Sequence, residues 1–158
     1  MLDLDGTALR GFADLTLALE RECRLIGDLS GAILRQREAV ARSDVPGVES
    51  SITLASRALL TLQETRRYRA TLLQRLVGDP AQPLAELDTH FDATLPETFL
   101  VARRRVQSSA AEVSEEVWRN QEVLLGALRE REALLRELLT GSRPAPPAEP
   151  PRAAIAEG

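Results

Sequence analysis

A long apolar repeat in the last third of the chain constrains the fold more than any other feature. Between residues 106 and 138, apolar side chains recur at alternating steps of four and three residues, and only Asn120 and Arg131 interrupt them. This heptad spacing is typical of helices that pack at shallow crossing angles. It predicts a helix from about residue 97 to Thr140, ended by Gly141. The repeat positions are Val106, Ala110, Val113, Val117, Asn120, Leu124, Ala127, Arg131, Leu134 and Leu138.

Two earlier segments also have helical periodicity. They run from about residue 7 to 42 and from 45 to 77, and "RSDVPG" separates them, with Asp44 placed to cap the second helix. The breaker "GDPAQP" ends the second segment and leaves room for one short helix before residue 95. The expected inner residues are Phe12, Leu15, Leu19, Cys23, Ile26, Leu29, Ile33 and Val40 in the first segment, Val48, Ile52, Ala55, Leu59, Leu62, Leu73 and Leu76 in the second, and Leu84, Leu87 and Phe91 as a lid on the end of the bundle.

These patterns predict an all-α fold. Hydrophobic residues make up 44% of the chain but aromatic residues only 3%, which favours helices packed through leucine and alanine over a sheet. Helices of more than 30 residues suggest an elongated antiparallel bundle of three long helices plus a short connecting helix, with coiled-coil-like packing, over residues 1–141. Residues 142–158 are rich in proline and alanine, so we expect a disordered tail.

Bulk properties indicate a soluble cytoplasmic protein. No basic stretch precedes an apolar core at the start, and no uncharged apolar run approaches the ~20 residues of a membrane span. Cys23 is the only cysteine, which suits a reducing compartment. The net charge of −4 argues against nucleic acid or an anionic membrane as the main partner.

Residues 3–7, Asp-Leu-Asp-Gly-Thr, spell the nucleophile motif of the haloacid-dehalogenase phosphatases. In that family the motif follows a buried central strand and is served by a later lysine. Here only two residues precede it, nothing later is typical of strands, and the chain has no lysine. We therefore interpret Asp3 and Asp5 as the acidic start of the first helix, which Asp5 or Thr7 can cap.

No other constellation indicates an active site. His90 is the only histidine, Cys23 lies among aliphatic residues and is expected to be a small core residue, and no cluster has metal-ligand spacing. The sequence therefore predicts a protein that is not an enzyme and holds neither cofactor nor metal. The arginine clusters at 66–69 and 103–105 are expected to form ion pairs, with docking of an acidic partner as the alternative. Asn120 is expected to be a buried polar group that sets the helix register.

The end of the third helix carries more leucine than one packing face requires. The apolar residues of "VLLGALREREALLRELL" cover an arc of roughly 200° at 100° per residue. Two interpretations stay open. The arc is buried between two neighbouring helices of the same chain, or part of it faces water until a partner helix covers it.

The order of features resembles the FlgN family of flagellar export chaperones. The resemblance is carried by "LALERECRLIGDL", by "REAVARSDVPGVESSITLASRALLTLQETRRYRATLLQRL" and by "WRNQEVLLGAL", in which an Asn precedes paired leucines. It spans about residues 12–139. The acidic leader and the Pro-rich tail depart from the family pattern.

The resemblance implies a bacterial cytoplasmic chaperone of flagellum biogenesis and type III secretion. Such a chaperone binds the C-terminal amphipathic helices of the hook–filament junction proteins, keeps them export-competent and delivers them to the flagellar export apparatus. The alternative is a structural coiled-coil protein that self-associates, as a homo-oligomer, through its third helix. The family's binding region maps onto the wide apolar arc, and the expected partner-binding residues are Leu124, Leu125, Leu128, Leu135 and Leu139.

Overall fold

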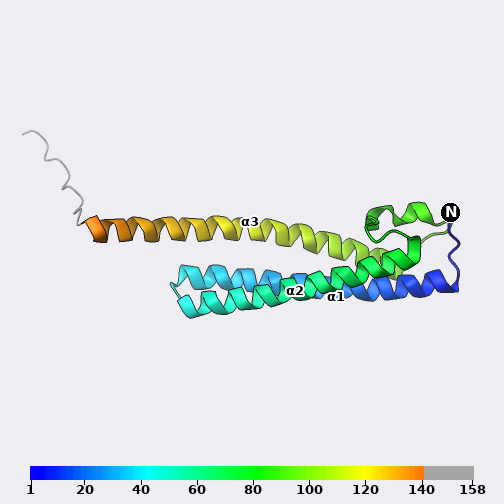
Figure 1. Ribbon diagram of the computed structural model, residues 1–158, viewed down its shortest axis with the longest axis horizontal. Coiled ribbons are helices and arrows are strands. Elements are labelled where there is room, and N and C mark those ends of the chain that lie inside the picture. Colours follow the sequence, from blue (N-terminus) through cyan, green and yellow to red (C-terminus); the bar gives the residue numbers. More distant parts are fainter. Residues whose placement is uncertain (141–158) are drawn as a thin grey trace, which may run out of the picture. The chain divides into compact units, whose positions relative to one another are not determined.

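The computed structural model describes residues 1–140, and every regular element in that range is helical (Figure 1). Helix α1 spans Gly6–Ala41, α2 spans Val45–Val77, the short 3-10 helix η1 spans Leu84–His90, and α3 spans Glu97–Thr140. The all-α prediction is confirmed. The bounds predicted for the first two helices differ from the observed ones by at most one residue. Gly141 and the predicted disordered tail, 142–158, lie outside the described residues.

The chain divides into two compact units, and the boundary lies between Leu124 and Leu125. The first comprises residues 1–124 and contains α1, α2, η1 and the N-terminal part of α3. The second begins at Leu125 and contains the C-terminal part of α3. All buried side chains of the described chain belong to the first unit.

Helices α1 and α2 form an antiparallel hairpin (Figure 1). The turn between them reverses the chain through Ser43, whose φ of 56° is positive. Asp44 then caps α2, as predicted, by accepting a hydrogen bond from the Gly47 amide at 3.0 Å. At the other end of α2, Gly78 adopts the left-handed conformation with a φ of 79°, which glycine reaches without steric penalty.

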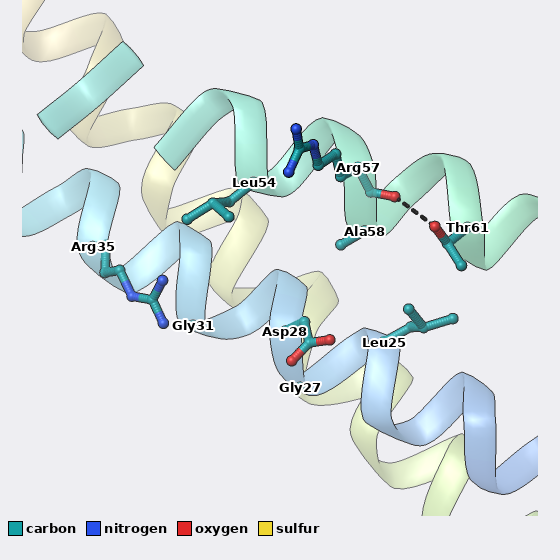
Figure 2. A pocket seen from close by; sticks show the side chains of 9 residues that line it. All are labelled: Leu25, Gly27, Asp28, Gly31, Arg35, Leu54, Arg57, Ala58 and Thr61. Carbon is teal, nitrogen blue, oxygen red and sulfur yellow. Dashed lines mark hydrogen bonds between the residues drawn. The ribbon is translucent and has the colours of Figure 1, made fainter. Parts of the chain in front are cut away.

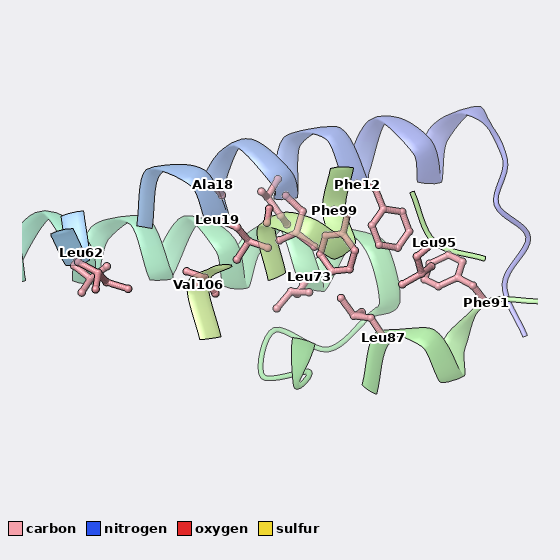
Figure 3. Close-up of a cluster of buried hydrophobic side chains, with 14 residues drawn as sticks. Phe12, Ala18, Leu19, Leu62, Leu73, Leu87, Phe91, Leu95, Phe99 and Val106 are labelled. Carbon is pink, nitrogen blue, oxygen red and sulfur yellow. The ribbon is translucent and has the colours of Figure 1, made fainter. Parts of the chain in front are cut away.

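The main core lies where the N-terminal parts of α1 and α3 meet the end of α2 and η1 (Figure 3). The Phe12 ring contacts Phe91 edge-on at a centroid distance of 5.1 Å and Phe99 at 5.0 Å. Leu87 from η1 is fully buried in the same cluster, and Leu84 packs partly buried against it. Leu87 and Phe91, two of the three residues expected to form a lid, are thus part of this core.

A second cluster brings α3 against both helices of the hairpin. Leu29 and Ile33 of α1 and Ala58 of α2 are buried, and Val113 and Val117 of α3 pack against them. Polar contacts between α1 and α3 advance in the same order along both helices: Cys23 with Ser109, Ser30 with Glu116 and Gln36 with Asn120. Within this unit α3 therefore runs in the direction of α1 and opposite to α2.

The inner face predicted for α2 was partly wrong. Ile52 and Leu59 are 48% and 46% exposed. The buried positions include Ser51, Ala58 and Thr65, so small and polar side chains form part of the inner face. Leu62 and Leu73 are buried as predicted, and Val48, Ala55 and Leu76 are half-buried. In α1, every predicted inner residue is buried except Cys23 and Val40, which are half-buried.

No helix within residues 1–140 is long and apolar enough to cross a membrane.

Candidate partner-binding surface on α3

The burial of α3 side chains stops at Asn120. Upstream of it, Phe99, Ala102 and Val106 are buried in the first unit. Asn120 is itself 6% exposed, and its amide Nδ2 donates a hydrogen bond to Gln36 Oε1 of α1. From residue 121 to Thr140 the helix has no buried residue. The heptad repeat thus faces a core in its first half and is open in its second.

The five leucines predicted to bind a partner lie in this open half. Leu124 is half-buried, whereas the other four side chains are between 51% and 84% exposed. At 100° per residue, the five positions fall within roughly 100° of the helix surface and form one stripe. The residues of this leucine stripe are Leu124, Leu125, Leu128, Leu135 and Leu139.

A second set of apolar residues borders the leucine stripe. Val123, Leu134 and Leu138 are 41%, 58% and 80% exposed, and Ala127 is half-buried. Together the two sets account for the predicted arc of roughly 200°. The sequence left two interpretations of this arc open. Within residues 1–140, the arc is not buried between neighbouring helices. An apolar face of this extent on a helix surface is typical of a binding site for another helix.

A groove lies between α1 and α2 (Figure 2). It has a volume of about 340 Å³, and all of its lining residues come from these two helices. Leu25 and Leu54 form its apolar part, and Asp28, Arg35 and Arg57 contribute charges of both signs. The one hydroxyl of this lining, that of Thr61, donates to the Arg57 carbonyl at 3.0 Å.

The dehalogenase-like pentapeptide is used for helix capping. Asp5 Oδ1 accepts hydrogen bonds from the Thr7 and Ala8 amides at 2.9 and 2.8 Å, which confirms the predicted cap of α1. Just before it, the Leu2 amide donates to the His90 carbonyl at 2.7 Å in an isolated bridge with Phe91. No group of acidic, histidine or cysteine side chains within residues 1–140 has the arrangement of a metal site.

A buried ionic cluster joins α1 to α2 and was missed at the sequence level. Glu22 is 1% exposed, its Oε2 accepts a hydrogen bond from Arg69 Nη1 at 2.8 Å, and Arg66 Nε lies 3.7 Å away. Burial raises the pKa of Glu22 above its ordinary value, while the two arginines act in the opposite direction. The sequence did contain a pattern that indicates the burial of Glu22. This residue follows Leu19 by three residues and precedes Ile26 by four, so it lies on the apolar face of α1.

Within residues 1–140, four of the six arginines in the two clusters form ion pairs, and Arg67 and Arg105 do not. Besides the two arginines bound to Glu22, Arg103 Nη1 lies 3.0 Å from Asp88 Oδ2 and also donates to the Leu84 carbonyl. The Arg103 guanidinium lies 5.6 Å from the centre of the Phe99 ring. Arg104 is near Glu97 at 3.4 Å, with both side chains largely exposed. The contacts of Arg103 attach η1 to α3. Because Arg66, Arg69 and Arg103 are already paired within the protein, nothing supports the alternative that these three residues dock an acidic partner.

Comparison with known proteins gives no match: neither a family model, nor a curated sequence, nor a solved structure is similar to this chain at a significant level.

Proposed function

We propose that this protein binds an amphipathic helix of another protein through the leucine stripe of α3. The observation that carries the proposal is the exposure of Leu125, Leu128, Leu135 and Leu139 on a helix whose upstream half is well packed. Complete burial of one leucine side chain is worth about 1.5–3 kcal/mol before the costs of ordering and association. Five leucines on one stripe can therefore support a specific complex without any hydrogen bond.

The sequence resemblance gives this binding a biological setting. We propose a cytoplasmic flagellar type III export chaperone whose clients are the C-terminal helices of the hook–filament junction proteins. In this mechanism, the client helix lies along the leucine stripe with its apolar residues covered, so it stays unassembled until the export apparatus receives it. Coiled-coil-like packing between α3 and the client is part of the proposal, because the heptad repeat continues through Leu138.

The first prediction concerns the leucine stripe itself. The double substitution Leu128→Asp with Leu135→Asp places two carboxylates on the stripe and should abolish client binding. Because both side chains are more than half exposed, helicity should remain near that of the wild type. Pull-down of the two junction proteins of the same organism measures binding, and circular dichroism measures helicity.

A matched control uses exposed leucines outside the leucine stripe. Leu17 and Leu60 are 63% and 64% exposed on α1 and α2. Leu17→Asp with Leu60→Asp introduces the same charge and the same loss of helix propensity, and it should leave binding intact. Failure of the wild-type protein to retain either junction protein would rule out the chaperone proposal. Loss of helicity in the α3 variant would show instead that its leucines belong to a core.

A further inference from the structure

The charged residues of α3 between Leu125 and Thr140 fall into two groups. Arg129, Glu132 and Arg136 lie together on one side of the helix, where Glu132 has an arginine three residues before it and another four residues after it. These spacings allow ion pairs within the helix. The group carries a net charge of +1, and within residues 1–140 none of its three side chains lies within 4 Å of an opposite charge.

Arg131 belongs to the other group, and its position is unusual. It occupies a heptad position in line with Leu124 and Leu138, and the residues three and four positions away on either side are Ala127, Leu128, Leu134 and Leu135. No carboxylate of residues 1–140 lies within 4 Å of its guanidinium. Arg131 is thus a cation in the middle of an exposed leucine surface.

Glu130 and Glu137 form a negative flank beside this surface. They are seven residues apart, so they lie on the same side of the helix, next to Leu134 and Leu138. The positions three and four residues from each of them hold no basic side chain. Their charges, like that of Arg131, have no complement on their own helix.

A second copy of the same surface would be a poor partner. Parallel pairing in register places the two Arg131 side chains in the same layer, and antiparallel pairing centred midway between Glu130 and Glu137 places Glu130 of one copy near Glu137 of the other. Like charges oppose both arrangements. A cation that becomes covered by an apolar partner also needs a carboxylate, because an unpaired buried charge is strongly unfavourable.

We infer that the partner is an amphipathic helix of a different protein that carries a carboxylate within its apolar face and basic side chains along one flank. The carboxylate would lie against Arg131, and the basic flank would run along Glu130 and Glu137. This inference rests on the proposed function, and it adds the feature by which one helix is selected over other leucine-rich helices.

Two synthetic peptides test the inference with the full-length protein. Both have the same length and the same leucine positions. The first carries Glu at the centre of its apolar face and Lys along one flank, and the second carries Lys at the centre and Glu along the flank. Affinities are measured by isothermal titration calorimetry, after the self-association of each peptide has been measured alone.

The first peptide should bind the wild-type protein about tenfold more tightly or better. Arg131→Glu should weaken this preference, because the central charges then repel while the flank charges still attract, whereas Arg129→Glu, the same charge change on the opposite side of the helix, should retain it. Equal affinity for both peptides, or a preference that Arg131→Glu does not change, would overturn the inference and leave helix binding intact. Binding of neither peptide would overturn both the inference and the proposed function.

Discussion

At the scale of single residues, Glu22 is the most deeply buried polar side chain within residues 1–140. It is almost completely buried between α1 and α2, and its Oε1 has no hydrogen-bond partner within the described chain. Arg69 and Arg66 approach only Oε2. Desolvation of the carboxylate is therefore only partly compensated, which is why burial outweighs the arginines in setting its pKa.

The raised pKa of Glu22 predicts a pH-dependent stability. The native state binds the proton of the Glu22 carboxyl group more tightly than the unfolded state does. The contribution of this proton to the free energy of unfolding is therefore fully present below the ordinary pKa of 4.5, and it is lost as the pH rises through the raised pKa of the native state. Gln at position 22 resembles the protonated side chain and does not titrate. The free energy of unfolding of the wild type should therefore fall relative to that of Glu22→Gln between pH 4.5 and neutrality.

Urea unfolding of the two proteins at a series of pH values measures this difference. Glu20→Gln removes an exposed carboxylate from the same helix and serves as the matched control. A wild type that gains stability relative to Glu22→Gln as the pH rises would show that the arginines dominate over burial.

The sequence predicted which polar residue is buried in α3, but not the side chains with which such residues form hydrogen bonds. Asn120 was expected to be buried because it interrupts an apolar repeat, and it is. Its partner Gln36 and the pairing of Ser30 with Glu116 were not foreseen. These contacts join residues more than eighty positions apart, so they depend on how α3 is placed along α1, which no local pattern specifies.

At the scale of helices, the boundaries were the most predictable feature. "RSDVPG" and "GDPAQP" are strong local signals because proline, glycine and capping residues act within a few positions of themselves. The inner face of α2 was less predictable. Its leucines are distributed around the helix, and the small residues Ser51 and Ala58 are buried where the apolar pattern selected the residues next to them.

The cap of α1 leads to a prediction at this scale. Asp5→Ala removes the acceptor for the Thr7 and Ala8 amides and should lower the free energy of unfolding by about 1 kcal/mol. Asp3→Ala, two residues earlier and exposed, should change it by less than about 0.5 kcal/mol. Chemical denaturation of both variants checks the expectation, and equal effects would show that the pentapeptide does not act through the cap.

At the scale of the whole molecule, the apolar residues are used in two ways. Residues 1–124 bury part of theirs in two clusters that join α1, α2, η1 and α3, although Leu17, Leu60 and Trp118 are exposed. The helix from Leu125 onward keeps its leucines exposed. The sequence indicated this surface by an excess of leucine over what one face needs. It could not decide between internal burial and exposure, because that depends on which segments of α1 and α2 lie beside α3.

The central claim is that the leucine stripe of α3 binds a helix of another protein, and methyl NMR of the full-length protein tests it most directly. On addition of the C-terminal helix of a hook–filament junction protein, the methyl signals of Leu125, Leu128, Leu135 and Leu139 should shift. Those of Leu15 and Leu19, which are fully buried in the main core, should stay in place. Binding that shifts other leucines and leaves these four unchanged, or an absence of any shift at saturating helix, would contradict the account.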